Sequence, residues 1–144
     1  MPIYTLHQKI DRFRKLASND EFTDSYIDTA LWNSTGPGSD MESKNLDTQH
    51  LAPECKAQLH QDCQLFQRQH AKLLEEAYEA GASEERMGRD FWFGRNWAGT
   101  GFGDGHIPYD LGAKLTLAAH QFGEMNLYLG DDGLIYCTPI KLLN

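Results

Sequence analysis

The sequence has little that would suit a membrane or an oxidising compartment. None of its apolar runs approaches the roughly 20 residues of a membrane-spanning helix, so we predict no membrane partner. The first residues also lack the continuous apolar core of a secretory signal. Cysteines are few, and Cys55 and Cys63 lie two turns apart in one predicted helix, too far for a disulfide bond. We therefore predict a reduced protein of the cytoplasm.

Basic residues are scarce as well. The chain has 13 lysines and arginines against 21 aspartates and glutamates, which gives a net charge of −8. A broad, non-specific nucleic-acid interface needs clustered basic side chains, so the composition disfavours one. The charge is instead typical of a solvated acidic surface, or of a protein whose partner is basic.

Motifs that would identify a reaction are missing. The six histidines show no His-Glu-x-x-His spacing, and the cysteines form no Cys-x-x-Cys pair. The glycines of residues 99–105 lack the Gly-Lys-Ser/Thr sequence of a phosphate-binding loop. We therefore predict a protein that is not an enzyme and that has no cofactor or metal. The only cluster that could be tried for catalysis is Arg95, Asp104 and His106.

The chain length fits one domain that spans residues 1–144. Within it, residues 33–50 are mostly polar and contain a Gly-Pro-Gly sequence, which predicts a flexible loop. A structureless segment of this length is long for a compact domain. The alternative is that Met41 and Leu46 anchor the segment to the body.

Apolar residues recur at helical spacing along much of the chain. Ser83 and Asp110 are suitable caps for the last two of these segments. The predicted helices cover residues 6–17, 22–32, 53–80, 84–89 and 111–122.

Two β-rich runs flank the turn sequence Gly-Asp-Asp-Gly and predict a hairpin with strands at 126–130 and 134–138. The aromatic residues at 91–94 predict a third strand. Together these elements predict an α+β fold, in which four to five helices pack on a small antiparallel sheet of about three strands.

The most unusual stretch is DFWFGRNWAGTGFGDG, residues 90–105, with five aromatic residues and five glycines. Large rings supply contact area, and glycines let the backbone turn sharply or approach a partner closely. We therefore predict a recognition loop that follows a strand. Its predicted contact residues are Arg95, Asn96, Trp97, Phe102, Asp104 and His106.

This stretch and the predicted hairpin resemble the corresponding parts of other proteins. The residues concerned are Asp90-Phe91-Trp92, Arg95-Asn96, Gly99, Gly101-Phe102, Asp104, Leu127-Tyr128, Gly130-Asp131-Asp132-Gly133 and Ile135-Tyr136. They resemble a group of small, mostly uncharacterised proteins encoded by bacteriophages and mobile elements. Members often have a histidine where this chain has Ala98, and a second ring where it has Gly103. The missing histidine argues against catalysis here.

The resemblance implies a phage-type accessory protein, located in the host cytoplasm. We predict that it binds and inhibits a host protein, such as a defence or nucleic-acid-processing enzyme, because rings and arginines are enriched in binding hot spots. The alternative is a small nucleic-acid or nucleotide-binding protein, in which Arg95 contacts phosphate and Trp97 stacks on a base. The identity of the partner and the oligomeric state are not predicted.

Overall fold

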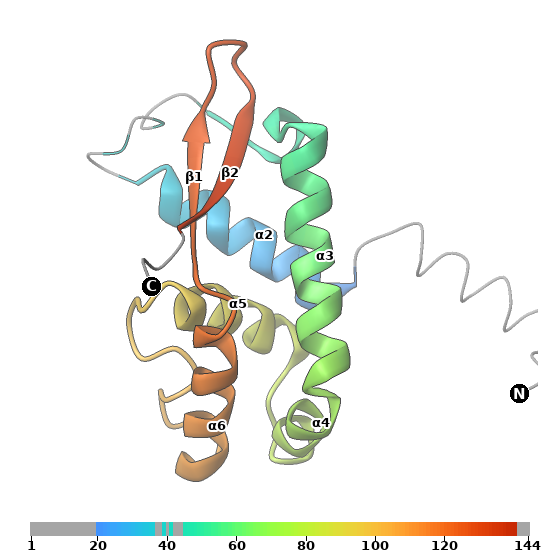
Figure 1. Ribbon diagram of the computed structural model, residues 1–144. Coiled ribbons are helices and arrows are strands. Elements are labelled where there is room, and N and C mark those ends of the chain that lie inside the picture. Colours follow the sequence, from blue (N-terminus) through green and yellow to red (C-terminus); the bar gives the residue numbers. More distant parts are fainter. Residues whose placement is uncertain (1–19, 37–38, 40, 42–44, 141–144) are drawn as a thin grey trace, which may run out of the picture.

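The computed structural model describes residues 20–36, 39, 41 and 45–140. The helix predicted over residues 6–17 lies outside this part of the chain. The described residues form an α+β fold, in which five α-helices pack with a two-stranded antiparallel sheet (Figure 1). The elements are α2 (Glu21–Ser34), the 3-10 helix η1 (Thr48–His50), α3 (Pro53–Gln69), α4 (Ala71–Glu79), α5 (Glu84–Arg95), α6 (Tyr109–His120), β1 (Glu124–Leu129) and β2 (Ile135–Ile140).

Helix α2 begins where the side chain of Asp20 accepts a hydrogen bond from the backbone N–H of Thr23, at 2.8 Å. Its buried stripe faces α5, and the two helices cross closely at Gly88. A Cβ atom at Gly88 would lie 2.0 Å from the carbonyl oxygen of Phe22. Glycine is therefore required for the two backbones to come this close.

The strand predicted at 91–94 is wrong, because these residues are the last turns of α5. Ser83 caps this helix as predicted and accepts a hydrogen bond from the backbone N–H of Arg86 at 3.0 Å. Met87, Phe91 and Arg95 are buried at four-residue intervals, which is the period of a helix. The rings that suggested a strand instead fill the core, where Phe91 stacks on Phe66 with centroids 4.2 Å apart.

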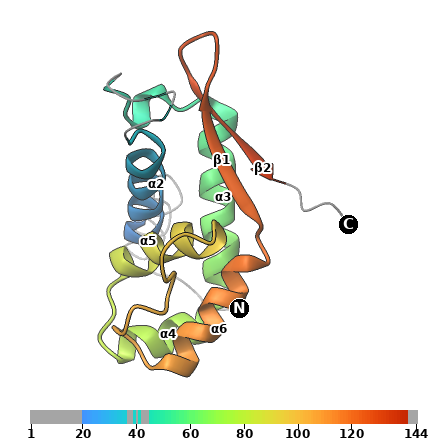
Figure 2. The same cartoon turned by 90° about the vertical axis from the view of Figure 1, so that its left-hand side faces the viewer.

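The helix predicted over 53–80 is divided at His70, where the backbone leaves helical geometry. Helix α3 runs along the molecule, and α4 turns away at its lower end (Figure 1). This turn lets Leu74 and Ala77 reach the core. Both views place the hairpin beside the upper part of α3 and place α6 near α4 at the opposite end (Figures 1 and 2).

The predicted hairpin is confirmed, with β1 and β2 antiparallel and Leu127 opposite Cys137. Met125, Leu127 and Ile135 face the core. The backbone N–H of Ala52, just before α3, donates to the carbonyl oxygen of Ile135 at 2.9 Å. Residues 51–52 therefore attach the start of α3 to the edge of the sheet.

The structure describes part of the segment predicted as a flexible loop, residues 33–50. In that part Met41 is buried, and Leu46 packs against the core. Asp47 caps η1 by accepting a hydrogen bond from the backbone N–H of Gln49 at 2.9 Å. For these residues the structure follows the alternative in which Met41 and Leu46 anchor the segment. No helix among the described residues is long and apolar enough to cross a membrane.

Candidate functional site

The structure divides the predicted recognition loop into a buried part and an exposed part. Arg95 and Phe102 are each only 1% exposed and belong to the core. Trp97 is 64% exposed, and Asp104 and His106 also lie on the surface. The loop follows a helix, and only its exposed part is available to a partner.

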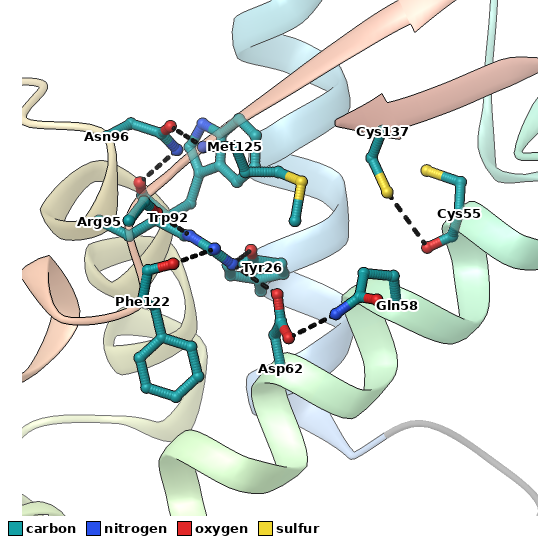
Figure 3. Close-up of polar contacts among 11 residues, drawn as sticks. Tyr26, Cys55, Gln58, Asp62, Trp92, Arg95, Asn96, Phe122, Met125 and Cys137 are labelled. Carbon is teal, nitrogen blue, oxygen red and sulfur yellow. Dashed lines mark hydrogen bonds and ion pairs between the residues drawn. The ribbon is translucent and has the colours of Figure 1, made fainter. Parts of the chain in front are cut away.

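Arg95 is at the centre of a buried polar network (Figure 3). Its Nη1 donates to Asp62 Oδ2 at 2.8 Å and to the hydroxyl of Tyr26 at 2.9 Å. Its Nε and Nη2 donate to the carbonyl oxygens of Gly123 and Phe122, at 2.9 and 3.0 Å. A buried charge is tolerated when it is paired and hydrogen-bonded in this way. The guanidinium is therefore fully committed to the fold, and the predicted role of Arg95 in ligand contact has no geometric support.

Asn96 and Phe102 are also held by the fold. The side chain of Asn96 accepts a hydrogen bond from the backbone N–H of Met125 at 2.8 Å and donates to the carbonyl oxygen of Trp92 at 2.9 Å (Figure 3). The backbone N–H of Phe102 donates to Thr116 Oγ1 at 3.2 Å, and its ring packs next to Gly94. The glycine-rich loop thus folds back onto α5 and α6.

Trp97 ends helix α5 in a conformation that side chains seldom adopt. Its φ is +55°, the left-handed region in which glycine is normally found at this position. The following N–H, of Ala98, bonds to the carbonyl oxygen of Phe93 at 2.9 Å, which completes the helix end. The indole stacks on His120 with ring centroids 3.5 Å apart. Such strain occurs at functional positions, so Trp97 is the residue to vary when the glycine-rich loop is tested as a contact surface.

A groove lies beside the exposed part of the loop, between α2, the first half of α5 and the glycine-rich loop. We call it the α2–α5 groove; its volume is about 820 Å³. A second hollow of about 540 Å³, near β1, includes Asn96 but no charged side chain. The α2–α5 groove is lined by Ser25, Asp28, Thr29, Trp32, Ser83, Glu85, Arg86, Arg89, Asp90, Phe93, Gly99, Thr100, Gly101 and Asp104.

One wall of the α2–α5 groove contains an incompletely paired set of charges. Arg86 Nη2 donates a hydrogen bond to Asp104 Oδ2, and Arg86 Nε lies 3.7 Å from Asp90 Oδ2. That distance is too long for a hydrogen bond. Both Arg86 Nε and Asp90 Oδ2 are buried without a hydrogen-bond partner among the described residues. Such unsatisfied groups are rare in folded proteins and require an explanation.

Asp90 is a strongly perturbed carboxyl group of this wall. It is 3% exposed, and burial raises its pKa to about 6. The positive charges of Arg86, Arg89 and His106 act in the opposite direction without offsetting the burial. Perturbed carboxyl groups in clefts mark candidate functional sites.

The α2 wall of the groove contributes Asp28 and Trp32. Burial raises the pKa of Asp28, and the neighbouring carboxylates of Asp24 and Glu85 raise it further. Trp32, in the last turn of α2, is 73% exposed. An exposed tryptophan beside a charged groove is typical of a binding surface.

Most residues of the groove are absent from the predicted site, which shares only Asp104 with it. Trp32 could have been found, because a helical projection of α2 places it outside the buried stripe of Phe22, Tyr26 and Ala30. Asp90 was hidden by the incorrect strand, which gave it no place on a helix face. The pairing of α2 with α5 has no signal in the sequence.

No group of three or more histidine, cysteine or acidic residues within the described ranges is arranged to hold a metal ion. Comparisons with protein-family models, with curated proteins and with solved structures find no match for this chain. The function must therefore be argued from the groove itself.

Proposed function

We propose that this chain is a binding protein that captures another protein through the α2–α5 groove. The observation that carries the proposal is the groove itself, which places the exposed ring of Trp32 beside buried, incompletely paired charges. Aromatic and arginine side chains around a desolvated pocket are the usual composition of a binding hot spot.

Binding is favoured over catalysis because the cluster considered for catalysis is not available. Arg95 is enclosed by the core, and Asp104 is engaged by Arg86 and by a 3.4 Å hydrogen bond from the backbone N–H of His106. The described residues that line the groove include serine and threonine hydroxyls but no histidine and no cysteine, which are the usual activating base and thiol nucleophile.

The nucleic-acid alternative has less support than protein binding. It relied on Arg95 to contact phosphate, and that side chain is buried. Four carboxylates line the α2–α5 groove against two guanidiniums, which would repel a phosphate backbone. We therefore propose, in keeping with the resemblance to phage and mobile-element proteins, that the partner is a host protein whose activity is inhibited by capture.

Two exposed tryptophans provide a matched test. Trp32 lines the α2–α5 groove, whereas Trp97 stacks on His120 outside it. Tagged wild-type, Trp32→Ala and Trp97→Ala proteins are used to capture partners from a bacterial lysate, and the affinity of the recovered, purified partner is then measured by calorimetry. We expect Trp32→Ala to weaken binding at least tenfold, because a hot-spot ring contributes on the order of 1.4 kcal/mol or more.

Trp97→Ala is expected to retain the partner with an affinity close to that of the wild type. If no specific protein is recovered, the binding function is wrong. If Trp97→Ala loses the partner and Trp32→Ala keeps it, the contact surface is the glycine-rich loop and the groove is not the site.

A further inference from the structure

The α2–α5 groove has an excess of negative charge. Asp28, Glu85, Asp90 and Asp104 line it, and only Arg86 and Arg89 oppose them. Arg86 is already engaged by Asp104. Burial raises the pKa of Asp28 on the α2 wall, and the nearby carboxylates of Asp24 and Glu85 raise it further. A ligand that enters the groove therefore meets a site that favours positive charge.

Asp90 supplies an independent observation that points to a ligand. Its carboxylate is almost completely buried, and one oxygen accepts no hydrogen bond from the described residues. Burying a charged group without a partner is costly. A cation in the groove next to Asp90 would provide the positive charge that Arg86 Nε, at 3.7 Å, supplies only in part.

The apolar part of the groove selects among cations. Trp32 and Phe93 offer rings along the same groove, and the indole of Trp32 is exposed. Arginine is suited to this combination, because its planar guanidinium stacks on aromatic rings and donates up to five hydrogen bonds to carboxylates. An ammonium group is a compact, strongly hydrated charge and matches the rings less well.

We propose that the α2–α5 groove binds the guanidinium group of an arginine side chain on the partner protein, which stacks on Trp32 and pairs with Asp90 and Asp28. The proposal rests on the protein-binding function proposed above and specifies what that site recognises.

Binding to this site depends on pH in a defined direction. A guanidinium prefers the ionised form of Asp90, whose pKa is about 6. Between pH 7.5 and pH 5.0 the ionised fraction falls about tenfold, and the affinity falls by about the same factor. Asp28 on α2, whose pKa is also raised, acts in the same direction. The basic side chains that face Asp90 are Arg86 and Arg89 on α5 and His106 on the loop.

The test uses the full chain, labelled with ¹⁵N, and titrates it with Nα-acetyl-arginine methylamide. The uncharged citrulline analogue and inorganic phosphate serve as the neutral and anionic probes. We expect arginine to produce saturable shifts at the Trp32 indole and at the Thr100 amide, with an affinity at least tenfold above that of citrulline. The arginine affinity is expected to be about tenfold weaker at pH 5.0 than at pH 7.5.

Three variants connect the binding to the groove. Asp90→Asn and Asp28→Asn are each expected to weaken arginine binding at least fivefold, and Asp131→Asn at the exposed hairpin tip is expected to leave it unchanged. Asp28 is on the exposed side of α2, so its variant tests the site without changing a buried group. The proposal is overturned if citrulline binds as well as arginine, if phosphate shifts the groove residues more strongly, or if Asp28→Asn has no effect.

The outcomes separate this inference from the proposed function. If the captured protein requires Trp32 but the arginine and citrulline probes bind equally, protein binding stands and the arginine site is wrong. If arginine binds as described but no protein is captured, the cation site stands and the proposed function is wrong.

Discussion

Two arginines of helix α5, one near each end of the helix, each pair with an aspartate. The hydrogen bonding of one pair is complete, and that of the other is not. Near the C-terminal end, Arg95 contacts Asp62 at 2.8 Å, and every nitrogen of its guanidinium donates a hydrogen bond. Near the N-terminal end, Arg86 Nε stops 3.7 Å from Asp90, and both atoms are buried without a hydrogen-bond partner among the described residues.

The difference shows how to separate a structural pair from an available one. The aspartates of the two pairs are similarly shielded from water, with side chains 5% and 11% exposed, so their burial does not distinguish the pairs. Completeness of hydrogen bonding does, because a satisfied pair has nothing left to offer a ligand, whereas an unsatisfied carboxylate gains from a new partner. On this basis Arg95 stabilises the fold, and Asp90 belongs to the site.

The most severe way to break the structural pair is Arg95→Met. It leaves Asp62 as a buried charge without its partner and is expected to lower the free energy of unfolding by about 3–5 kcal/mol. Urea unfolding at pH 7.5 measures the change. The double variant Arg95→Met/Asp62→Leu removes the uncompensated charge and should recover part of the loss. A single-variant loss below about 1 kcal/mol would contradict the description of the network as buried and complete.

Asp90→Asn tests the incomplete pair. Its expected effect on the free energy of unfolding is opposite in sign to that of Arg95→Met. Burial raises the folded-state pKa of Asp90 to about 6 from an ordinary 3.8, so the folded state binds more protons between these values. Stability therefore falls as the pH rises from about 4 to about 6, and the penalty is complete above that range. Removal of the charge should stabilise the protein at pH 7.5 by on the order of 1–3 kcal/mol.

At pH 4 residue 90 is neutral in both folded proteins, the wild type and the variant, so the two should be similar in stability. Urea unfolding at the two pH values provides the comparison, with Asp131→Asn as the control on an exposed turn. A variant that is destabilised at pH 7.5 would mean that Asp90 is well paired, and the contrast between the two pairs would disappear.

The smallest effect is expected at Trp97, just beyond the C-terminal end of α5. Trp97→Gly relieves a φ of +55° but removes the stacking on His120. The two contributions are each on the order of 1 kcal/mol and of opposite sign, so the free energy of unfolding should change by less than about 1 kcal/mol. A larger loss in thermal or urea unfolding would show that the indole holds the glycine-rich loop in place.

Local signals in the sequence predicted the hairpin, the Ser83 cap and most helix positions, because each depends on a few adjacent residues. The strand at 91–94 failed because rings favour strands on average, whereas packing of Phe91 against Phe66 and Tyr26 decides the outcome here. The site failed for a related reason. The charge and rings of residues 95–104 were visible in the sequence, but the tertiary contacts that enclose Arg95 and Phe102 were not.

The close crossing at Gly88 has a consequence for the affinity of the site. Since the backbone of α5 touches that of α2 at Phe22, the two helices cannot slide or separate without disrupting the core. Asp28 and Trp32 on one helix and Asp90 on the other are thus held in register before any partner arrives. In the proposed capture, ligand binding avoids most of the entropy cost of ordering the site, so even a small contact area can yield specific binding.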